Sequence, residues 1–486
     1  MKKISTIGTG IGGLATAIRL ASKGYGVTVF EQQPNVGGKL NQLKANGFRF
    51  DTGPSLFTLP NLVDELIELS ANKQVVLPYK KLEVITRYFF PDGTILNAWS
   101  DPEQFADEVQ KTLGESRSSV AKYLMDSKEL YDLTAKTFVF SPFPRLSNLF
   151  TLQSLKLALN PKKLRAFETM HDVNAKYFGK HNAIQLFDRY ATYNGSNPYK
   201  APGTLTMIPH LEHNIGAYFP MQGMYSIAEQ LKEIALSLNV EFVMNSKVDR
   251  INQRNGRVAG VKVNGTDFSS DFVINNTDIF TAYSSILSDV PLSERLAKQE
   301  PSSSALIFYW GVKGDYPQLD VHNVLFSENY WAEFQAMEAK TIYTDPTVYI
   351  FITSKMISDD APLGHENWFV MINAPENINQ NWDELRLTAK ASILNKIKKT
   401  LGLDIEKNIV FEEFLDPERI EKRTGSFRGS LYGISSNNRM AAFNRHPNRS
   451  KKVEGLFFVG GSVHPGGGIP LCLASAKIVD SYFKLL

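Results

Sequence analysis

Glycines gathered in three places are the residues of this sequence whose type and spacing indicate chemistry. One group is G-x-G-x-x-G at 8–13, another lies between 37 and 53, and the last is VGGSVHPGGGIP at 459–470. Glycine lets the backbone approach a ligand closely, and the amides at a helix start attract negative charge. The pattern therefore predicts a phosphate-containing cofactor held by main-chain amides.

The first glycine group has the order of a dinucleotide-binding βαβ unit. A short apolar strand precedes Gly8, an amphipathic helix follows, and a second strand ends at Glu31. Gly8 permits a tight turn, Gly10 lets a pyrophosphate approach the helix, and Gly13 lets the helix pack closely on the strand. Glu31 is expected to accept hydrogen bonds from the ribose hydroxyls of the adenosine half.

The second group decides between NAD and FAD. Gly37, Gly38 and Lys39 precede GFRFDTGPSLF at 47–57, which predicts a β-ribbon and a further glycine loop. An NAD domain would continue directly into its next βαβ unit. We therefore predict FAD, with contacts in this region from Gly38, Lys39, Gly53, Pro54 and Ser55.

The terminal group is predicted to hold the flavin ring. LFFV at 456–459 is typical of a buried strand, and the glycines after it lead into a final helix. Amides at such a helix start stabilise the negative charge of a reduced ring. The expected contacts are Gly460, Gly461, Gly468, Ile469 and Pro470.

Composition excludes several function classes. The 486 residues, 54.5 kDa, predict two or three domains, and 53 basic against 50 acidic residues are too evenly balanced for a nucleic-acid-binding protein. The single cysteine, Cys472, excludes internal disulfides and thiolate metal clusters and suits a reducing, cytoplasmic compartment. No window reaches the ~18 apolar residues of a membrane span, so membrane contact is expected to be peripheral. The eight histidines are scattered and hydrolase motifs are missing, so no metal site is predicted.

The elements between the glycine groups complete the predicted organisation. Helical patterns follow Phe57, strands alternate between 301 and 413, and a glycine turn, helix and strand lie between 218 and 251. The run 138–167 joins Phe and Leu to Arg145, Lys156, Lys162, Lys163 and Arg165. Two interpretations of this run stay open: an amphipathic segment at an anionic membrane surface, or a helical cap with solvated lysines.

The glycine groups also carry a family resemblance. TIGTGIGGL, Glu31, GGK at 37–39, GFRFDTGP and HPGGGIP resemble the phytoene desaturase family of carotenoid desaturases, related more distantly to amine oxidases. GSNP at 195–198, LEHNIGAYFPMQGM and PQLDVHNVLFS extend the likeness over nearly the whole chain. Lys39 departs from the pattern, because the family usually has arginine there.

The resemblance implies an α/β fold: a Rossmann-type FAD-binding domain with an inserted substrate-binding sheet and a helical cap. The expected FAD domain is discontinuous, over 1–80, 218–285 and 420–486. A cap over 81–217 and a mixed substrate sheet over 286–419 complete the chain. Within the middle FAD segment, Val248 would offer its backbone to the adenine and Asp278 would close the segment.

The resemblance further implies desaturation of a long polyene, with a hydride passing to flavin N5 and a proton leaving the neighbouring carbon. His464 and Glu212 are the candidates for proton removal or ring orientation, with His210 and His213 behind them. The protein is expected at the inner face of the cell membrane, with oxygen or a quinone as electron acceptor.

Several alternatives remain open at this point. A carotenoid isomerase or saturase, an amine oxidase and a non-catalytic carotenoid-binding flavoprotein share parts of the pattern. Among desaturases, the substrate is either phytoene or a hydroxylated acyclic end oxidised at its 3,4 bond.

Overall fold

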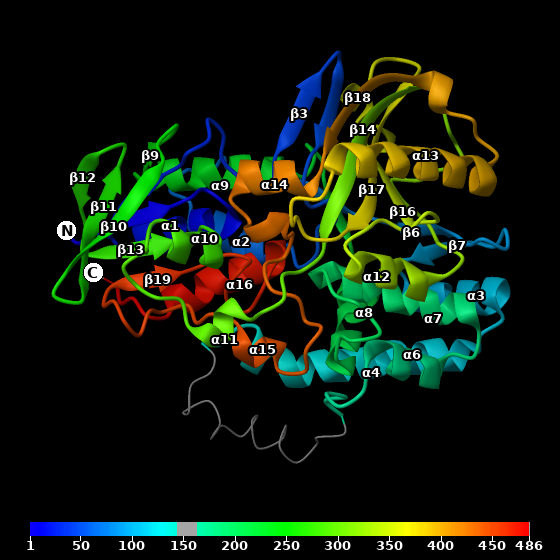
Figure 1. The fold of residues 1–486 in the computed structure, drawn as a ribbon, viewed down its shortest axis with the longest axis horizontal. Helices are drawn as coiled ribbons and strands as arrows, with labels where there is room; N and C mark the ends of the chain where they lie inside the picture. Colours follow the sequence, from blue (N-terminus) through cyan, green and yellow to red (C-terminus); the bar gives the residue numbers. More distant parts are fainter. Residues whose placement is uncertain (143–162, 486) are drawn as a thin grey trace.

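The computed structural model describes residues 1–142 and 163–485, and its first sheet is parallel. Five strands lie in the order β19–β13–β1–β2–β9, and every neighbouring pair is parallel. Their bounds are Leu456–Phe458, Phe272–Asn275, Lys3–Ile7, Gly26–Phe30 and Glu241–Val243. Strands from both ends and the middle of the chain thus form one sheet, as the predicted α/β class requires (Figure 1).

Three helices accompany this sheet. They are α1 (Ile11–Ala21), α9 (Ser226–Ser237) and α16 (Ile469–Asp480), and α1 packs against the other two. Small residues of α1, including Gly12, Gly13 and Ala17, are buried, because a close helix contact leaves no room for larger side chains. The first and last glycine groups therefore lie at the starts of two neighbouring helices.

The second sheet has seven strands in the order β18–β14–β17–β16–β15–β6–β7. Their bounds are Ile409–Leu415, Ser304–Lys313, His365–Ala374, Val348–Ile352, His322–Leu325, Val84–Phe89 and Ile95–Trp99. All pairs are antiparallel except β15 with β6. This is the mixed sheet that the alternating pattern between 301 and 413 predicted.

Alternation along β14 separates the two faces of this sheet. Phe308 and Trp310 pack into a cluster with Ile393 and Ile397 of α13 (Trp382–Leu401). Ile307 and Tyr309 point to the opposite face, where they line a cavity. Side chains of a strand alternate between faces, so one strand supplies both a core layer and a cavity wall.

The cap lies below the second sheet in Figure 1. It contains α3 (Pro102–Leu113), α4 (Arg117–Phe138), α6 (Met170–Tyr177), α7 (His181–Asp188), the 3-10 turns η2 (Arg189–Asn194) and η3 (Gly203–Met207), α8 (Ile208–His210) and the π turn η4 (Leu211–Ile215). The run 138–167 with Arg145, Lys156 and Lys162 falls largely on 143–162, outside the described residues.

One predicted domain boundary differs from the structure. The range 81–217 was expected to be a cap, but β6 and β7 within it belong to the seven-stranded sheet. Residues 84–99 form a hairpin around Pro91–Gly93, and β6 pairs with β15 more than 200 residues later. Such long-range pairing leaves no local signal of which sheet a hairpin joins.

The remaining elements include a three-stranded sheet, β10–β11–β12, and two two-stranded sheets, β3–β4 and β5–β8. They are β3 (Gln42–Ala45), β4 (Phe48–Asp51), α2 (Asn61–Glu68), β5 (Tyr79–Lys81), β8 (Tyr218–Pro220), β10 (Val248–Arg254), β11 (Arg257–Val263), β12 (Thr266–Ser269), α10 (Ile279–Ser284), α11 (Glu294–Ala297), α12 (Tyr330–Glu338), α14 (Pro417–Thr424), α15 (Ala441–Asn444) and the short 3-10 turns η5 to η8 (Thr353–Lys355, Ser358–Asp360, Glu406–Asn408, Phe427–Gly429). Within the described ranges, no helix combines the length and the apolar character needed to cross a membrane.

Candidate active site

The turn before α1 is built from glycines that leave no room for a side chain. Gly8 has φ +90°, a conformation that favours glycine. A Cβ on Gly13 would lie 2.2 Å from the carbonyl oxygen of Gly8, and one on Gly10 would lie 2.7 Å from Asn276 Nδ2. Gly8 and Gly10 line a large cavity, whereas Gly13 lies behind them against the strand turn.

Glu31 lies directly after β2 and lines the same cavity. Its Oε2 accepts hydrogen bonds from the amide and the hydroxyl of Thr9 at 2.8 and 2.6 Å, and its Oε1 accepts one from the amide of Gln33 at 2.9 Å. These bonds fix the carboxylate beside the turn. Oε1 keeps a free lone pair, whereas both lone pairs of Oε2 are used by Thr9, so the expected ribose contact stays a prediction that this geometry permits at Oε1.

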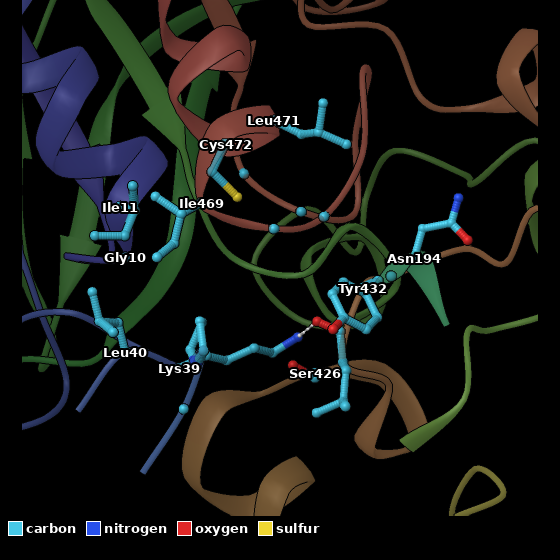
Figure 2. Close-up of a pocket in the computed structure, with 18 of the residues that line it drawn as sticks. Gly10, Ile11, Lys39, Leu40, Asn194, Ser426, Tyr432, Ile469, Leu471 and Cys472 are labelled. Carbon is cyan, nitrogen blue, oxygen red and sulfur yellow. Dashed lines mark hydrogen bonds between the residues drawn. The ribbon is translucent and has the colours of Figure 1, made fainter. Parts of the chain in front are cut away.

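Lys39 lies in the cavity wall but is held by protein carbonyls. Its Nζ donates to the carbonyl oxygens of Ser430 and Leu431 at 2.8 and 2.7 Å. Figure 2 shows the side chain extending toward the segment that carries Tyr432, opposite Ile469 at the start of α16. Burial lowers the pKa of Lys39 to about 8. The expected contact with flavin phosphates remains a prediction.

The terminal glycines meet the first group in space. Gly460 and Gly468 have φ +103° and +104°, and Gly468 directly precedes α16. A Cβ on Gly460 would lie 2.7 Å from Asn276 Oδ1. Both helix starts, of α1 and of α16, therefore open onto one cavity.

The middle segment adds the remaining predicted contacts. Val248 begins β10, and Asp278 caps α10 by accepting a hydrogen bond from the amide of Phe280 at 2.9 Å. Burial raises the pKa of Asp278, and the nearby charge of Lys39 opposes that shift. Every predicted cofactor contact except Gly13 lines the cavity, which measures about 1270 Å³.

This cavity fits a bound flavin nucleotide. Four glycines, at 10, 12, 13 and 460, surround the side chain of Asn276 so closely that an added Cβ would approach it to between 2.7 and 3.1 Å. Asn276 thus fixes the spacing of the two glycine turns. The volume exceeds the ~300–1,000 Å³ of most single-ligand pockets, which leaves room for a second, apolar ligand.

Apolar residues of the second sheet and the cap form the other half of the cavity. Ile307, Phe369 and Met371 line it from the sheet, and Ile208 and Leu211 line it from the cap. An apolar ligand can therefore lie against one sheet face while the glycine turns hold the cofactor.

Glu212 lies in η4 and also lines the cavity. It accepts hydrogen bonds from the hydroxyls of Tyr193 and, at 2.8 Å, Tyr190. The guanidinium of Arg189 lies 4.0 Å from Glu212 Oε2. Burial raises the pKa of Glu212, while Arg189 and the tyrosines oppose this shift. A carboxylate in this setting can take up a proton near the substrate.

His464 occupies a different position from the one expected. Its Nε2 lies 3.0 Å from the carbonyl oxygen of Ser141, just after α4, and the imidazole is not part of the described cavity wall. Burial lowers its pKa to about 4. His464 therefore joins the terminal loop to the cap, while its neighbours Pro465 and Gly467 line the cavity.

The two histidines near Glu212 support the cap. His213 Nε2 lies 2.9 Å from the Tyr190 hydroxyl, and its ring stacks on Phe105 with centroids 4.0 Å apart. Burial lowers the pKa of His213 to about 3. His210 Nδ1 lies 2.9 Å from Asn214 Nδ2. Both imidazoles hold neighbouring elements in place.

Comparison with known proteins agrees with this geometry. The family model of flavin containing amine oxidoreductases matches residues 11–479. The chain belongs to this family. It is an FAD-dependent oxidoreductase, and the predictions of FAD and of the Rossmann-type fold class are confirmed.

Curated relatives match over nearly their full lengths. The chain is 49% identical over 479 residues to the 1-hydroxycarotenoid 3,4-desaturase of Flavobacterium sp. (strain P99-3), covering 98% of each chain. It is 31% identical to the 4,4'-diaponeurosporene oxygenase of Staphylococcus aureus, covering 98% of this chain and 97% of that one. These matches confirm the resemblance to carotenoid desaturases.

Solved structures share the fold at low identity. A triple mutant of putrescine oxidase has a TM-score of 0.66 at 14% identity, covering 99% of this chain and 98% of that one. An oxidoreductase from Methanosarcina mazei has a TM-score of 0.64 at 16% identity, covering 99% and 100%. Both support the two-sheet architecture.

Sequence reasoning missed several cavity residues. Arg189, His322, Tyr330 and Tyr349 line the substrate half, and Asn276 joins the glycine turns. Asn276 had a usable signal, because it stands in the NNTD that follows a buried strand. The other four are scattered over different elements, so only the tertiary structure brings them together.

Proposed function

We propose that this enzyme is a carotenoid desaturase that oxidises a 1-hydroxycarotenoid at its 3,4 bond. The observation that carries the proposal is the 49% identity with such a desaturase, which extends over both the glycine turns and the substrate sheet. The reaction removes a hydride and a proton from adjacent carbons and leaves a C=C bond.

The cavity supports this proposal through its composition. When bound, FAD supplies the two-electron acceptor that carbon–carbon dehydrogenation needs. Ile307, Phe369 and Met371 exclude water from the sheet side, so a polyene can lie there without losing hydrogen bonds. Its conjugated chain disperses positive charge, so the protein contributes position more than charge.

Within the cavity, we assign proton uptake to Glu212. Its carboxylate lies among the hydroxyls of Tyr190 and Tyr193, and burial favours its protonated form. Arg189 balances its charge before the reaction. We assign His464 no part in this step, since its imidazole contacts the carbonyl oxygen of Ser141 and does not line the described cavity wall.

An amine oxidase is the second candidate, since structural neighbours include cyclohexylamine oxidase from Brevibacterium oxydans at a TM-score of 0.65 and 14% identity. Likeness at that identity supports the fold alone. The apolar sheet face favours a polyene over a charged amine, whose desolvation would be costly there.

The test is anaerobic flavin reduction. Purified holoenzyme is mixed with a 1-hydroxylated acyclic carotenoid or with a panel of primary amines, and the flavin absorption is followed. We expect bleaching with the carotenoid together with a red shift of the polyene bands. Bleaching by an amine alone would favour the oxidase, and an unchanged flavin spectrum with tight polyene binding would favour a carrier.

We further propose that the enzyme takes its substrate from a membrane surface. Phe167 and Met440 are 73% and 53% exposed, and the guanidinium of Arg439 lies 6.0 Å from the centroid of the Phe167 ring. Arg439 also lines the cavity. An exposed apolar group edged by a cation at a cavity wall suits contact with anionic lipid.

A further inference from the structure

Buried polar atoms in the substrate half of the cavity have no hydrogen-bond partner among the described residues. Those on side chains that line the cavity include His322 Nε2 and Tyr330 Oη, with Arg189 Nε and Asn194 Oδ1. His322 and Tyr330 are 2% and 1% exposed. An unpaired polar atom at such a depth costs free energy, so a ligand group that pairs with it gains accordingly.

The hydrogen bonds around His322 determine what its free nitrogen can do. Tyr349 donates its hydroxyl proton to Ser55 Oγ at 2.8 Å, so the 2.7 Å contact between Tyr349 Oη and His322 Nδ1 needs a proton on Nδ1. Burial lowers the pKa of His322 to about 3, and the charge of Arg189 adds to this. His322 is therefore neutral, and its Nε2 presents a lone pair.

Tyr330 offers the complementary group. It begins α12, and its ring contacts Phe326 and Phe334 edge-on, at 6.2 and 5.0 Å between centroids. Its hydroxyl can donate one hydrogen bond and accept another. Tyr330, His322 and Arg189 all line the same cavity.

The charge of Arg189 is already balanced by the groups around it. The Arg189 guanidinium lies 5.0 to 5.1 Å from the ring centroids of Tyr88, Tyr190 and Tyr193 and 4.0 Å from Glu212. A carboxylate ligand would meet the lone pair of His322, and a ketone, which can only accept, could not pair with His322 Nε2. A hydroxyl can donate to His322 Nε2 and accept from Tyr330, so it satisfies both.

We propose that His322 and Tyr330 bind the terminal hydroxyl of the polyene and thereby select the bond that is oxidised, an inference that rests on the proposed function. Ser55 follows Gly53 and Pro54 in the loop that lines the cofactor half, and Tyr349 links it to His322. The hydroxyl site is thus joined to the cofactor loop. That proximity suits a substrate whose 3,4 bond starts two carbons from the hydroxylated carbon.

The test compares two acyclic polyenes that differ only in the 1-hydroxyl, using wild-type holoenzyme and the variants Tyr330→Phe and His322→Phe. We expect the wild type to favour the hydroxylated polyene in kcat/KM by on the order of 10²-fold or more. Each variant should lower that ratio about 10-fold, because kcat/KM falls for the hydroxylated polyene and not for the other. Absorption spectra of the products should show that the variants also oxidise bonds other than the 3,4 bond.

Tyr316→Phe is the matched control. Tyr316 is a buried tyrosine at the same sheet whose hydroxyl donates to the carbonyl oxygen of Lys313, away from the described cavity wall. The Tyr316→Phe variant should leave the kcat/KM ratio of the two polyenes unchanged. Should His322→Phe fail to fold, Tyr349→Phe, which removes the partner of His322 Nδ1, should lower the ratio in the same direction.

The outcomes separate the two proposals. A wild-type ratio near one, or variants that slow both polyenes equally with normal flavin content, would overturn the hydroxyl site while leaving the desaturase intact. If neither polyene bleaches the flavin, both the proposed function and the hydroxyl site are overturned.

Discussion

Individual glycines control whether the cofactor turn can form. A methyl group on Gly13 would lie 2.2 Å from the Gly8 carbonyl, closer than real contacts allow. We expect Gly13→Ala to lower the free energy of unfolding by about 1–3 kcal/mol and to reduce the flavin content of the purified protein. Urea denaturation and the flavin absorption of the same preparation measure both effects.

Gly179→Ala is the control for that substitution. Gly179 is exposed, and an added Cβ would meet nothing within 4 Å. The Gly179→Ala variant should keep the flavin content and the free energy of unfolding of the wild type. Equal losses in the two variants would show that the turn does not depend on close packing at Gly13.

Lys39 makes the stability of the flavin-free protein depend on pH. Burial lowers its pKa from 10.5 in the unfolded chain to about 8 in the fold. Between these values the unfolded chain binds the extra proton, so the free energy of unfolding rises with pH, by about 3 kcal/mol at most. Below pH 8 both states are protonated, and this residue contributes no slope.

The measurement is urea denaturation of the flavin-free protein across pH 7 to 10.5. In Lys39→Met the rise due to this residue should be missing, while the other slopes persist. The same rise in the variant would mean that another group titrates there.

Glu212 is predicted to govern the pH dependence of flavin reduction. Because burial raises its pKa, the reduction rate should increase with pH through that elevated value and then level off as the carboxylate ionises. Glu212→Gln should lower the rate about 10²- to 10⁴-fold, abolish this limb and retain the flavin. Single-turnover kinetics with the polyene measure it.

Asp188→Asn is the matched control for Glu212. Asp188 is another buried carboxyl group of the cap, bonded to His171 and Asn174 and outside the described cavity wall. The pH profile of this variant should retain its limb. If the rise of the reduction rate with pH persists in Glu212→Gln, Glu212 is excluded as the proton acceptor.

At the scale of elements, Asp51 joins the β3–β4 hairpin to α9. Its carboxylate accepts hydrogen bonds from the amides of Met224 and Tyr225, both at 2.9 Å, and pairs with Arg49 at 2.7 Å. The Asp51 side chain is fully buried, so its charge is balanced by these groups rather than by water. The GFRFDTGP pattern thus contains the residue that fixes the ribbon on the FAD domain.

We expect Asp51→Asn to lower the free energy of unfolding by about 2–4 kcal/mol. The amide leaves the buried Arg49 cation partly unbalanced and turns a donor toward the α9 amides. Asp383→Asn, at an ion pair whose acidic side chain is 87% exposed, should change stability by less than about 1 kcal/mol. Similar losses in both would contradict a structural role for Asp51.

At the scale of the whole molecule, the cavity passes from the FAD domain to the cap. Its wall there includes Ala166 and Arg439, the chain neighbours of the exposed Phe167 and Met440. We expect Phe167→Ser with Met440→Ser to weaken binding to anionic liposomes about 10-fold or more, because two apolar side chains no longer enter the lipid. Flotation with liposomes of neutral and anionic lipid measures the partition.

The control pair is Leu363→Ser with Leu387→Ser. Both residues are exposed, and Leu387 lies on α13, across the molecule from α15 in Figure 1. This pair should bind liposomes like the wild type. Equal losses would indicate a general hydrophobic effect, and unchanged binding in the first pair would place the membrane contact elsewhere.

The sequence by itself determined the cofactor half of this protein. Glycine turns, an acid after the second strand and the terminal loop are local patterns, because each acts through backbone geometry within a few residues. The sequence also predicted helices in the cap and strands between 301 and 413, since period and turn residues are local properties.

Only the tertiary structure decided how distant pieces share one cavity. It placed β6 and β7 in the second sheet, turned His464 toward Ser141, and brought Arg189, His322 and Tyr330 to the wall of one cavity. Pairing between strands far apart in the chain and the burial of a charge depend on every packed element together. No short stretch of sequence contains that information.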